Sequence, residues 1–101
     1  MSVEFRDLRW AIVAAQHRSL RQAAEALNIR QSTLSRALRD LEHKLGATLF
    51  ERTNGGTRPT IEGQEFLDAS RRIVDETEAI TARLKTRSRG ESGRLTCVSA
   101  W

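Results

Sequence analysis

Cysteine is almost absent from this sequence of 101 residues, in which Cys97 is the single example. One thiol cannot form an internal disulfide, so a reducing compartment is the expected setting. Neither His17 nor His43 lies among cysteines or histidines at the spacing of zinc ligands. We therefore expect no bound metal and no cofactor.

Long apolar runs are also missing. The first four residues, Met1 to Glu4, lack the basic stretch and apolar run that a secretory signal peptide requires. No apolar run approaches the length needed to span a membrane. We expect a protein with no membrane partner and a cytoplasmic location.

Residues that break helices are few, with one proline and six glycines, while Ala, Leu, Glu and Arg dominate. Hydrophobic residues make up 39% of the chain, enough for one modest core and an appendage. Such a small chain has little room for an enclosed substrate cleft. The composition predicts a mainly helical protein.

The basic residues are nearly all arginine, since Lys44 and Lys85 are the only lysines among seventeen cations. The formal net charge is +4. The planar guanidinium group suits bidentate contacts to phosphate and guanine, which points toward nucleic acid. Composition alone leaves a solvated basic surface equally open.

Apolar spacing predicts two helices at the start of the chain. Phe5, Leu8, Ile12 and Ala15 recur every three or four residues, which indicates one face of a helix over 5–17. A second helix over 20–27 can be capped by Ser19. Its paired alanines at positions 23 and 24 permit close approach of another helix.

A third helix is predicted over 31–45, after a short turn at Asn28 and Ile29. Leucines at positions 34, 38, 41 and 45 form its inner face, and Gly46 ends it. Two helices joined by a tight turn, with polar side chains on the open face of the second, are typical of insertion into a DNA major groove.

Two short strands, 48–52 and 58–60, are predicted next, separated by the turn-rich stretch Thr53 to Thr57. Pro59 suits an edge strand. We interpret this segment as a small β-hairpin. The pair Gly55 and Gly56 belongs to its turn and is not a phosphate-binding loop.

A long helix over 61–86 follows, with Thr60 as its cap. Phe66, Ile73 and Ile80 lie seven residues apart, with Ser70, Thr77 and Leu84 between them. Such a seam favours pairing with a partner helix, although packing on the helix's own domain would produce the same pattern. The segment 87–93 is predicted to be a hinge, and 95–101 to begin an apolar strand.

Side chains on the open face of the third helix are candidates for reading DNA. Gln31 suits adenine and Arg36 suits guanine, while Ser32 and Ser35 are short enough to reach bases or phosphates. Gln31 and Ser32 are also suited to capping the helix. Arg39 and Lys44 are left out as sites because nearby carboxylates can balance them.

The chain also carries an ordered set of residues typical of one family. The set consists of Ala23, Ala24, Gln31, Ser32, Leu34, Ser35, Arg36, Leu41, Glu42, Leu45, Gly46, Leu49, Phe50, Arg52, Thr60 and Gly63. Over about residues 5–86 the sequence resembles the N-terminal domain of LysR-type bacterial transcription regulators. The resemblance implies a winged helix-turn-helix, with a three-helix core and a hairpin wing, followed by a long dimerisation helix.

The resemblance also implies contacts. It assigns Gln31, Ser32, Ser35 and Arg36 to the major groove, and Arg52 and Thr53 to the wing and phosphate backbone. Two departures stand out. Gly55 occupies a wing position where many members carry arginine, a contact that Arg58 could supply instead, and Arg30 replaces the usual serine. The dimerisation residues are Phe66, Ile73, Thr77, Ile80 and Leu84.

We therefore expect a DNA-binding domain over 1–60, a dimerisation helix over 61–86, and a hinge over 87–101 that leads to the start of an effector-binding domain. The expected partners are double-stranded DNA and a second copy of the chain, with tetramers possible in a full-length protein. A chain that pairs with a longer relative and blunts its activity remains an alternative. No catalytic residues are predicted.

Overall fold

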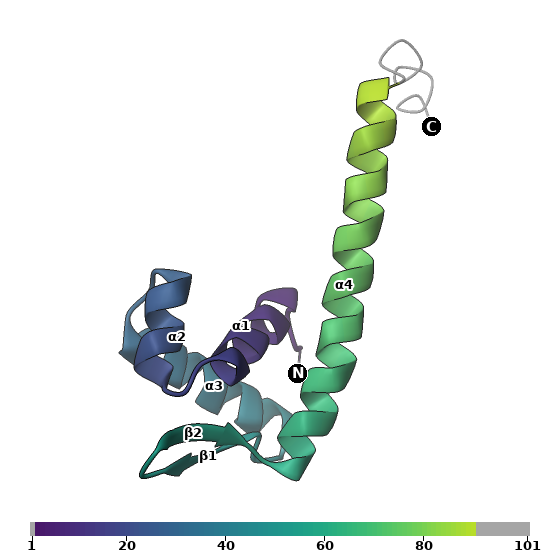
Figure 1. The fold of residues 1–101 in the computed structure, drawn as a ribbon. Helices are drawn as coiled ribbons and strands as arrows, with labels where there is room; N and C mark the ends of the chain where they lie inside the picture. The colour runs from purple at the N-terminus through teal and green to yellow at the C-terminus, as the bar shows by residue number, and fades with distance from the viewer. Residues whose placement is uncertain (1, 91–101) are drawn as a thin grey trace.

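The computed structural model describes residues 2–90, with side chains as far as Arg87. Its elements are α1 (Phe5–Gln16), α2 (Leu20–Leu27), α3 (Gln31–Leu45), β1 (Phe50–Thr53), β2 (Gly56–Pro59) and α4 (Ile61–Gly90). The first three helices gather beside the hairpin, and α4 rises away from them as a long rod (Figure 1). The predicted winged helix-turn-helix followed by a long helix is confirmed.

The ends of α2 and α3 lie where the sequence predicts them. The Ser19 hydroxyl accepts a hydrogen bond from the Gln22 amide at 3.2 Å, which caps α2. Asn28 closes α2 in the left-handed conformation, with φ 60°. Gly46 closes α3 in the same way, with φ 68°, and its amide donates to the Glu42 carbonyl. These two caps fix the short turn between the helices and the exit toward the wing.

One core joins the three short helices to the start of α4. Its fully buried members are mostly alanine and leucine. Ala11, Ala14, Ala23 and Ala24 let the backbones of α1 and α2 approach closely. The remaining core residues are Leu20, Leu34, Leu38, Leu41, Leu49 and Leu67. Each fully buried leucine contributes roughly 1.5–3 kcal/mol relative to an exposed one, so α3 is held firmly against the rest of the domain.

The predicted inner face of α1 is only partly buried, because Leu8, Ile12 and Ala15 are half-buried and are not the most buried positions of the helix. Phe5 is exposed, and the buried positions are Asp7, Ala11 and Ala14. Because α2 and α3 cover one side of α1 and α4 covers another, the covered surface is wider than a single stripe. Asp7 is buried with compensation: its Oδ2 accepts from the Glu4 amide at 3.0 Å and lies 3.7 Å from the Lys44 ammonium.

The hairpin is confirmed, but its strands are shifted from the predicted ranges. Thr53 pairs with Gly56, which leaves a turn of only two residues. Gly56 has φ 127°, and a Cβ at this position would collide with the carbonyl oxygen of Arg18. The Thr57 amide donates to that same carbonyl at 2.8 Å, so the wing is anchored to the loop before α2. This tertiary contact sets the register, and local turn preferences do not reveal it.

The cap of α4 is as predicted, whereas its end is not. The Thr60 hydroxyl accepts from the Gly63 amide at 3.0 Å and donates to the Thr48 carbonyl. The helix continues through residues 87–90, which were predicted to be hinge. Arginine is a good helix former, and each added residue gains one helical hydrogen bond, so propagation carries the helix past this stretch. The rest of the predicted hinge and the apolar strand lie outside the described residues.

Candidate nucleic-acid interface

The open face of α3 is polar and accessible. Arg30, Gln31, Ser32, Arg36 and Arg39 are exposed, whereas Ser35 is half-buried. Leu34, Leu38 and Leu41 on the opposite side of the helix are buried, whereas Leu45, which was predicted to belong to the same inner face, is exposed. The N-cap residue of α3, Arg30, makes no capping hydrogen bond with its side chain, and among residues 2–90 the side chains of Gln31 and Ser32 form no capping hydrogen bond either. Their side chains are left available at the entrance of the helix.

Arg36 lies on the side of α3 that faces α1. With Arg6, Trp10 and Asp40 it lines a groove of about 240 Å³ between the two helices. The Arg6 guanidinium stacks over the Trp10 ring, 5.2 Å from its centre. Within residues 2–90, no carboxylate oxygen lies within 4 Å of the Arg36 guanidinium. The positive charge of Arg36 therefore has no ion-pair partner within residues 2–90 and faces the space around α3.

The other side of α3 faces the wing. Here the Ser35 hydroxyl accepts hydrogen bonds from Arg39 Nη2 at 3.1 Å and from Arg52 Nη2 at 3.0 Å. These three residues line a groove of about 120 Å³ between α3 and the hairpin. The predicted residues Ser35 and Arg52 are thus brought together, and Arg39, which the sequence analysis left out, joins them. Its position four residues after Ser35 was the available signal.

A half-buried carboxylate fixes the wing to α3. Glu42 Oε2 accepts from the backbone amides of Leu49 at 2.7 Å and Phe50 at 3.1 Å. Hydrogen bonds to a charged acceptor are stronger than neutral ones. The start of β1 is therefore held at a defined place beside α3, which sets where Arg52 can reach.

The remaining predicted wing residues lie farther along the hairpin. The Thr53 hydroxyl donates to the Gly56 carbonyl at 3.2 Å and closes the turn. Arg58 is exposed on β2, opposite Glu51 in the antiparallel register. Neither side chain belongs to the cluster around Ser35. They form a second polar region at the hairpin itself.

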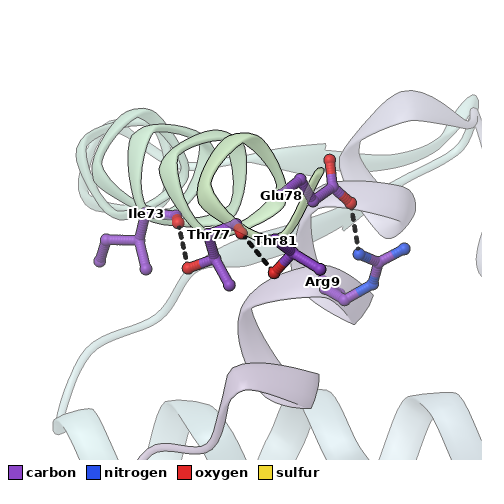
Figure 2. Close-up of polar contacts among 5 residues, drawn as sticks. All are labelled: Arg9, Ile73, Thr77, Glu78 and Thr81. Carbon is purple, nitrogen blue, oxygen red and sulfur yellow. Dashed lines mark hydrogen bonds and ion pairs between the residues drawn. The ribbon is translucent and has the colours of Figure 1, made fainter. Parts of the chain in front are cut away.

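The two sides of α4 differ in burial. Gly63, Leu67, Ser70 and Val74 are buried against the domain. The ion pair between Arg9 of α1 and Glu78, 2.7 Å long, extends this contact by one turn. Figure 2 shows Glu78 reaching toward Arg9, while Ile73 points away from that pair.

The predicted seam on α4 is exposed over its outer part. Ile73, Ile80 and Leu84 are 49%, 42% and 52% exposed. The Thr77 hydroxyl donates to the Ile73 carbonyl at 2.8 Å (Figure 2), so its polar group is satisfied within the helix. Phe66 is different because it is half-buried against the domain's own core. Beyond the first turns of α4, these apolar side chains therefore form a surface that the described residues leave exposed.

Between residues 2 and 90, no group of three or more histidine, cysteine or acidic side chains is placed to hold a metal ion. None of the helices in that range has both the length and the apolar character needed to cross a membrane.

Comparison with known proteins gives consistent matches. Residues 5–64 match the bacterial regulatory helix-turn-helix protein, lysR family. The chain is 41% identical over 93 residues to the HTH-type transcriptional regulator ClcR of Pseudomonas putida, covering 92% of this chain and 32% of ClcR. It is 32% identical over 93 residues to the DNA-binding transcriptional dual regulator OxyR of Escherichia coli, covering 92% of this chain and 30% of OxyR. The chain thus spans about a third of these relatives.

Solved structures agree with the sequence matches. A complex of the BenM DNA-binding domain with catB site 1 DNA superposes with a TM-score of 0.82 at 29% identity, covering 88% of this chain and 96% of that one. The LysR family transcriptional regulator CbnR gives 0.80 at 32% identity, covering 88% of this chain and 31% of CbnR. The chain therefore belongs to the LysR family of bacterial regulatory helix-turn-helix proteins, with its helix-turn-helix domain over residues 5–64.

Proposed function

We propose that this chain binds double-stranded DNA sequence-specifically as a homodimer and is the DNA-binding part of a bacterial transcription regulator. The observation that carries the proposal is the exposed polar face of α3, backed by buried leucines and flanked by an anchored wing. In this arrangement α3 enters the major groove, and the hairpin lies on the phosphate backbone or in the minor groove.

The entrance and middle of α3 supply the base contacts. Gln31 and Arg36 are exposed and carry the donor and acceptor patterns that match adenine and guanine edges. Ser32 is exposed beside them. Arg30, at the mouth of the helix, is placed for a phosphate contact.

The wing supplies backbone contacts. Arg52, Thr53 and Arg58 lie on the hairpin, and both arginines are exposed. Phosphate contacts of this kind position the protein on the duplex and carry no sequence information. They make the affinity dependent on salt, because each neutralised phosphate releases counterions.

Dimerisation uses the outer part of α4. A helix of 30 residues is about 45 Å long and reaches well past the domain it starts from. Ile73, Thr77, Ile80 and Leu84 form its apolar side, with half-buried Phe66 at the edge. The division of the chain into a DNA-binding domain over 1–60 and a dimerisation helix from 61 onward rests on this separation. Tetramers require the longer protein.

Matching relatives are named as transcriptional regulators. We extend this to the present chain as a regulator without enzymatic activity that acts in the cytoplasm, where bacterial DNA is found. No step of the proposed function needs a cofactor.

The test is selection of bound sequences from a pool of random duplexes at two salt concentrations. The expected result is enrichment of a short, partly palindromic site, with log affinity falling by roughly 0.9 per phosphate contact for each unit of log salt. Recovery of unselected sequences at both salt concentrations would contradict sequence-specific binding.

A second candidate function follows from the exposed apolar side of α4. Ile73, Ile80 and Leu84 could pair with the α4 helix of a longer relative and keep it from acting. In that case the purified chain forms stable dimers by light scattering but enriches no sequence from the pool.

A further inference from the structure

We propose that Arg39, Arg52 and Ser35 form a clamp for a single DNA backbone phosphate, in which Ser35 positions the two arginines. This inference rests on the proposed DNA binding and refines it. It assigns a role to Arg39, and it makes Ser35, which was predicted to reach bases or phosphates, an organiser of a phosphate contact.

Hydrogen bonding at Ser35 limits what this residue can recognise. A hydroxyl has two lone pairs and one O–H donor. Both arginines donate to the Ser35 oxygen, from α3 at 3.1 Å and from β1 at 3.0 Å. Within residues 2–90, no acceptor is found for the Ser35 hydroxyl hydrogen. The groups that remain free at this point are therefore all donors.

Charge at the cluster favours an anion. Arg39 and Arg52 each place an Nη2 atom about 3 Å from the same Ser35 oxygen, so two like charges are held near one another and repel. In the described part of the chain, neither arginine has a carboxylate oxygen within 4 Å. Glu42 lines the same groove, but its Oε2 is occupied by two backbone amides. A phosphate group offers only hydrogen-bond acceptors and carries negative charge. It can therefore accept from both arginines and offset the repulsion between them.

Position indicates a backbone phosphate and not a base. Ser35 is half-buried at the edge of α3 that faces the hairpin, whereas Arg36 is exposed and lies outside the groove between α3 and the hairpin. A helix in the major groove has a phosphate strand on each flank. The cluster joins α3 to β1 and is therefore placed where one of those strands must pass.

The test measures affinity against salt for the selected site and for a random duplex. The variants are Arg39→Ala, Arg52→Ala, the double variant of both, Ser35→Ala alone and in the double variant, and Ser35→Thr. Arg71→Ala on α4, whose arginine pairs with Asp68, controls for the loss of one positive charge. Circular dichroism of each variant verifies folding.

Sharing of one phosphate predicts a distinctive salt dependence. The double arginine variant loses about 0.9 from the slope of log affinity against log salt, because one contact disappears. Two separate phosphates would instead give a loss of about 1.8, which would overturn the shared clamp.

The positioning role of Ser35 predicts equal losses on both duplexes. Ser35→Ala weakens binding to each duplex by roughly three- to tenfold, and Ser35→Thr restores most of the affinity. In the double arginine variant, Ser35→Ala has no further effect on binding. A loss confined to the selected site, or one that persists without the arginines, would show that Ser35 reads a base. If the unmodified chain binds neither duplex, both the clamp and the proposed function are wrong.

Discussion

Arg36 offers the sharpest contrast between reading bases and holding phosphates. It is exposed on α3 and lies away from the cluster around Ser35. We expect Arg36→Ala to cost roughly 1–3 kcal/mol on the selected site and little on random DNA, because a lost base contact removes discrimination. Fluorescence anisotropy titrations of both duplexes measure this.

The matched comparison for Arg36 is Arg52→Ala, which removes a backbone contact and should weaken all sequences alike. Equal losses of Arg36→Ala on both duplexes would contradict its role in reading bases.

Gly63 is required by close packing at the start of α4. A Cβ at this position would collide with the carbonyl oxygen of Leu49. We expect Gly63→Ala to lower the free energy of unfolding by roughly 1–3 kcal/mol, since backbone atoms must shift to make room. Thermal unfolding followed by circular dichroism measures the change.

Gly55 provides the control for this prediction. A Cβ there meets only the Thr53 hydroxyl, 3.9 Å away, so Gly55→Ala should change stability by less than about 0.5 kcal/mol. If the two alanine variants unfold at the same temperature, the close contact at Gly63 is not important for stability.

The roles of individual residues could be predicted from the sequence where the cause is local. Ser19, Gly46 and Thr60 cap or end their helices through neighbours within four residues, so their roles can be read from sequence. Arg39 was missed because its significance depends on Arg52, which the folded wing brings to the same hydroxyl. The sequence shows both arginines but does not show that they lie close together in the fold.

Among the elements, α4 has the most direct test. Ile73 is 49% exposed on the side turned away from α1. We expect Ile73→Asp to convert dimers into monomers, because burying an unpaired carboxylate in an apolar helix pair is unfavourable. Light scattering gives the mass in solution.

Gln64→Asp adds the same charge at an exposed position near the start of α4 and outside the seam. It should leave the mass unchanged. A dimer that survives Ile73→Asp would exclude this surface as the contact between copies.

Apolar periodicity is sufficient to predict the bounds of some elements but not of others. The bounds of α2 and α3 follow from apolar spacing and end signals, and the structure confirms them. The predicted strand bounds of the wing were wrong because the contact of Gly56 with Arg18, distant in sequence, helps to decide where the strands pair. The predicted buried residues of α1 were incomplete because a helix covered from two directions has no single apolar stripe.

For the whole molecule, the order of elements could be predicted but the use of α4 could not. A seven-residue repeat fits packing on the helix's own domain and packing on a partner equally well. In the structure, the α4 side chains that pack on the domain and the apolar side chains that remain exposed lie on different sides of the helix. Leu67, Ser70 and Val74 are buried on the domain, and the outer isoleucines are exposed. The same helix therefore has one side buried on its own domain and another side whose apolar residues are exposed and open to the proposed partner.

This arrangement makes a prediction about DNA geometry. The molecule measures 57 × 27 × 20 Å, with α4 along its length. Because buried residues fix α4 to its own domain, the orientation of α3 relative to the dimer contact is also fixed. A dimer built through α4 must then hold its two α3 helices at one separation, about one turn of DNA apart.

Inserting about five base pairs between half-sites turns the second one to the opposite face of the duplex, since a helical turn contains about 10 base pairs. We expect affinity for the selected site to fall by at least tenfold on this insertion, toward that of a single half-site. The monomeric Ile73→Asp variant should bind both duplexes with the same weak affinity, because it has no second α3 helix to place. Equal affinity of the unmodified chain for both spacings would mean that its two domains contact DNA independently and that α4 does not set their separation.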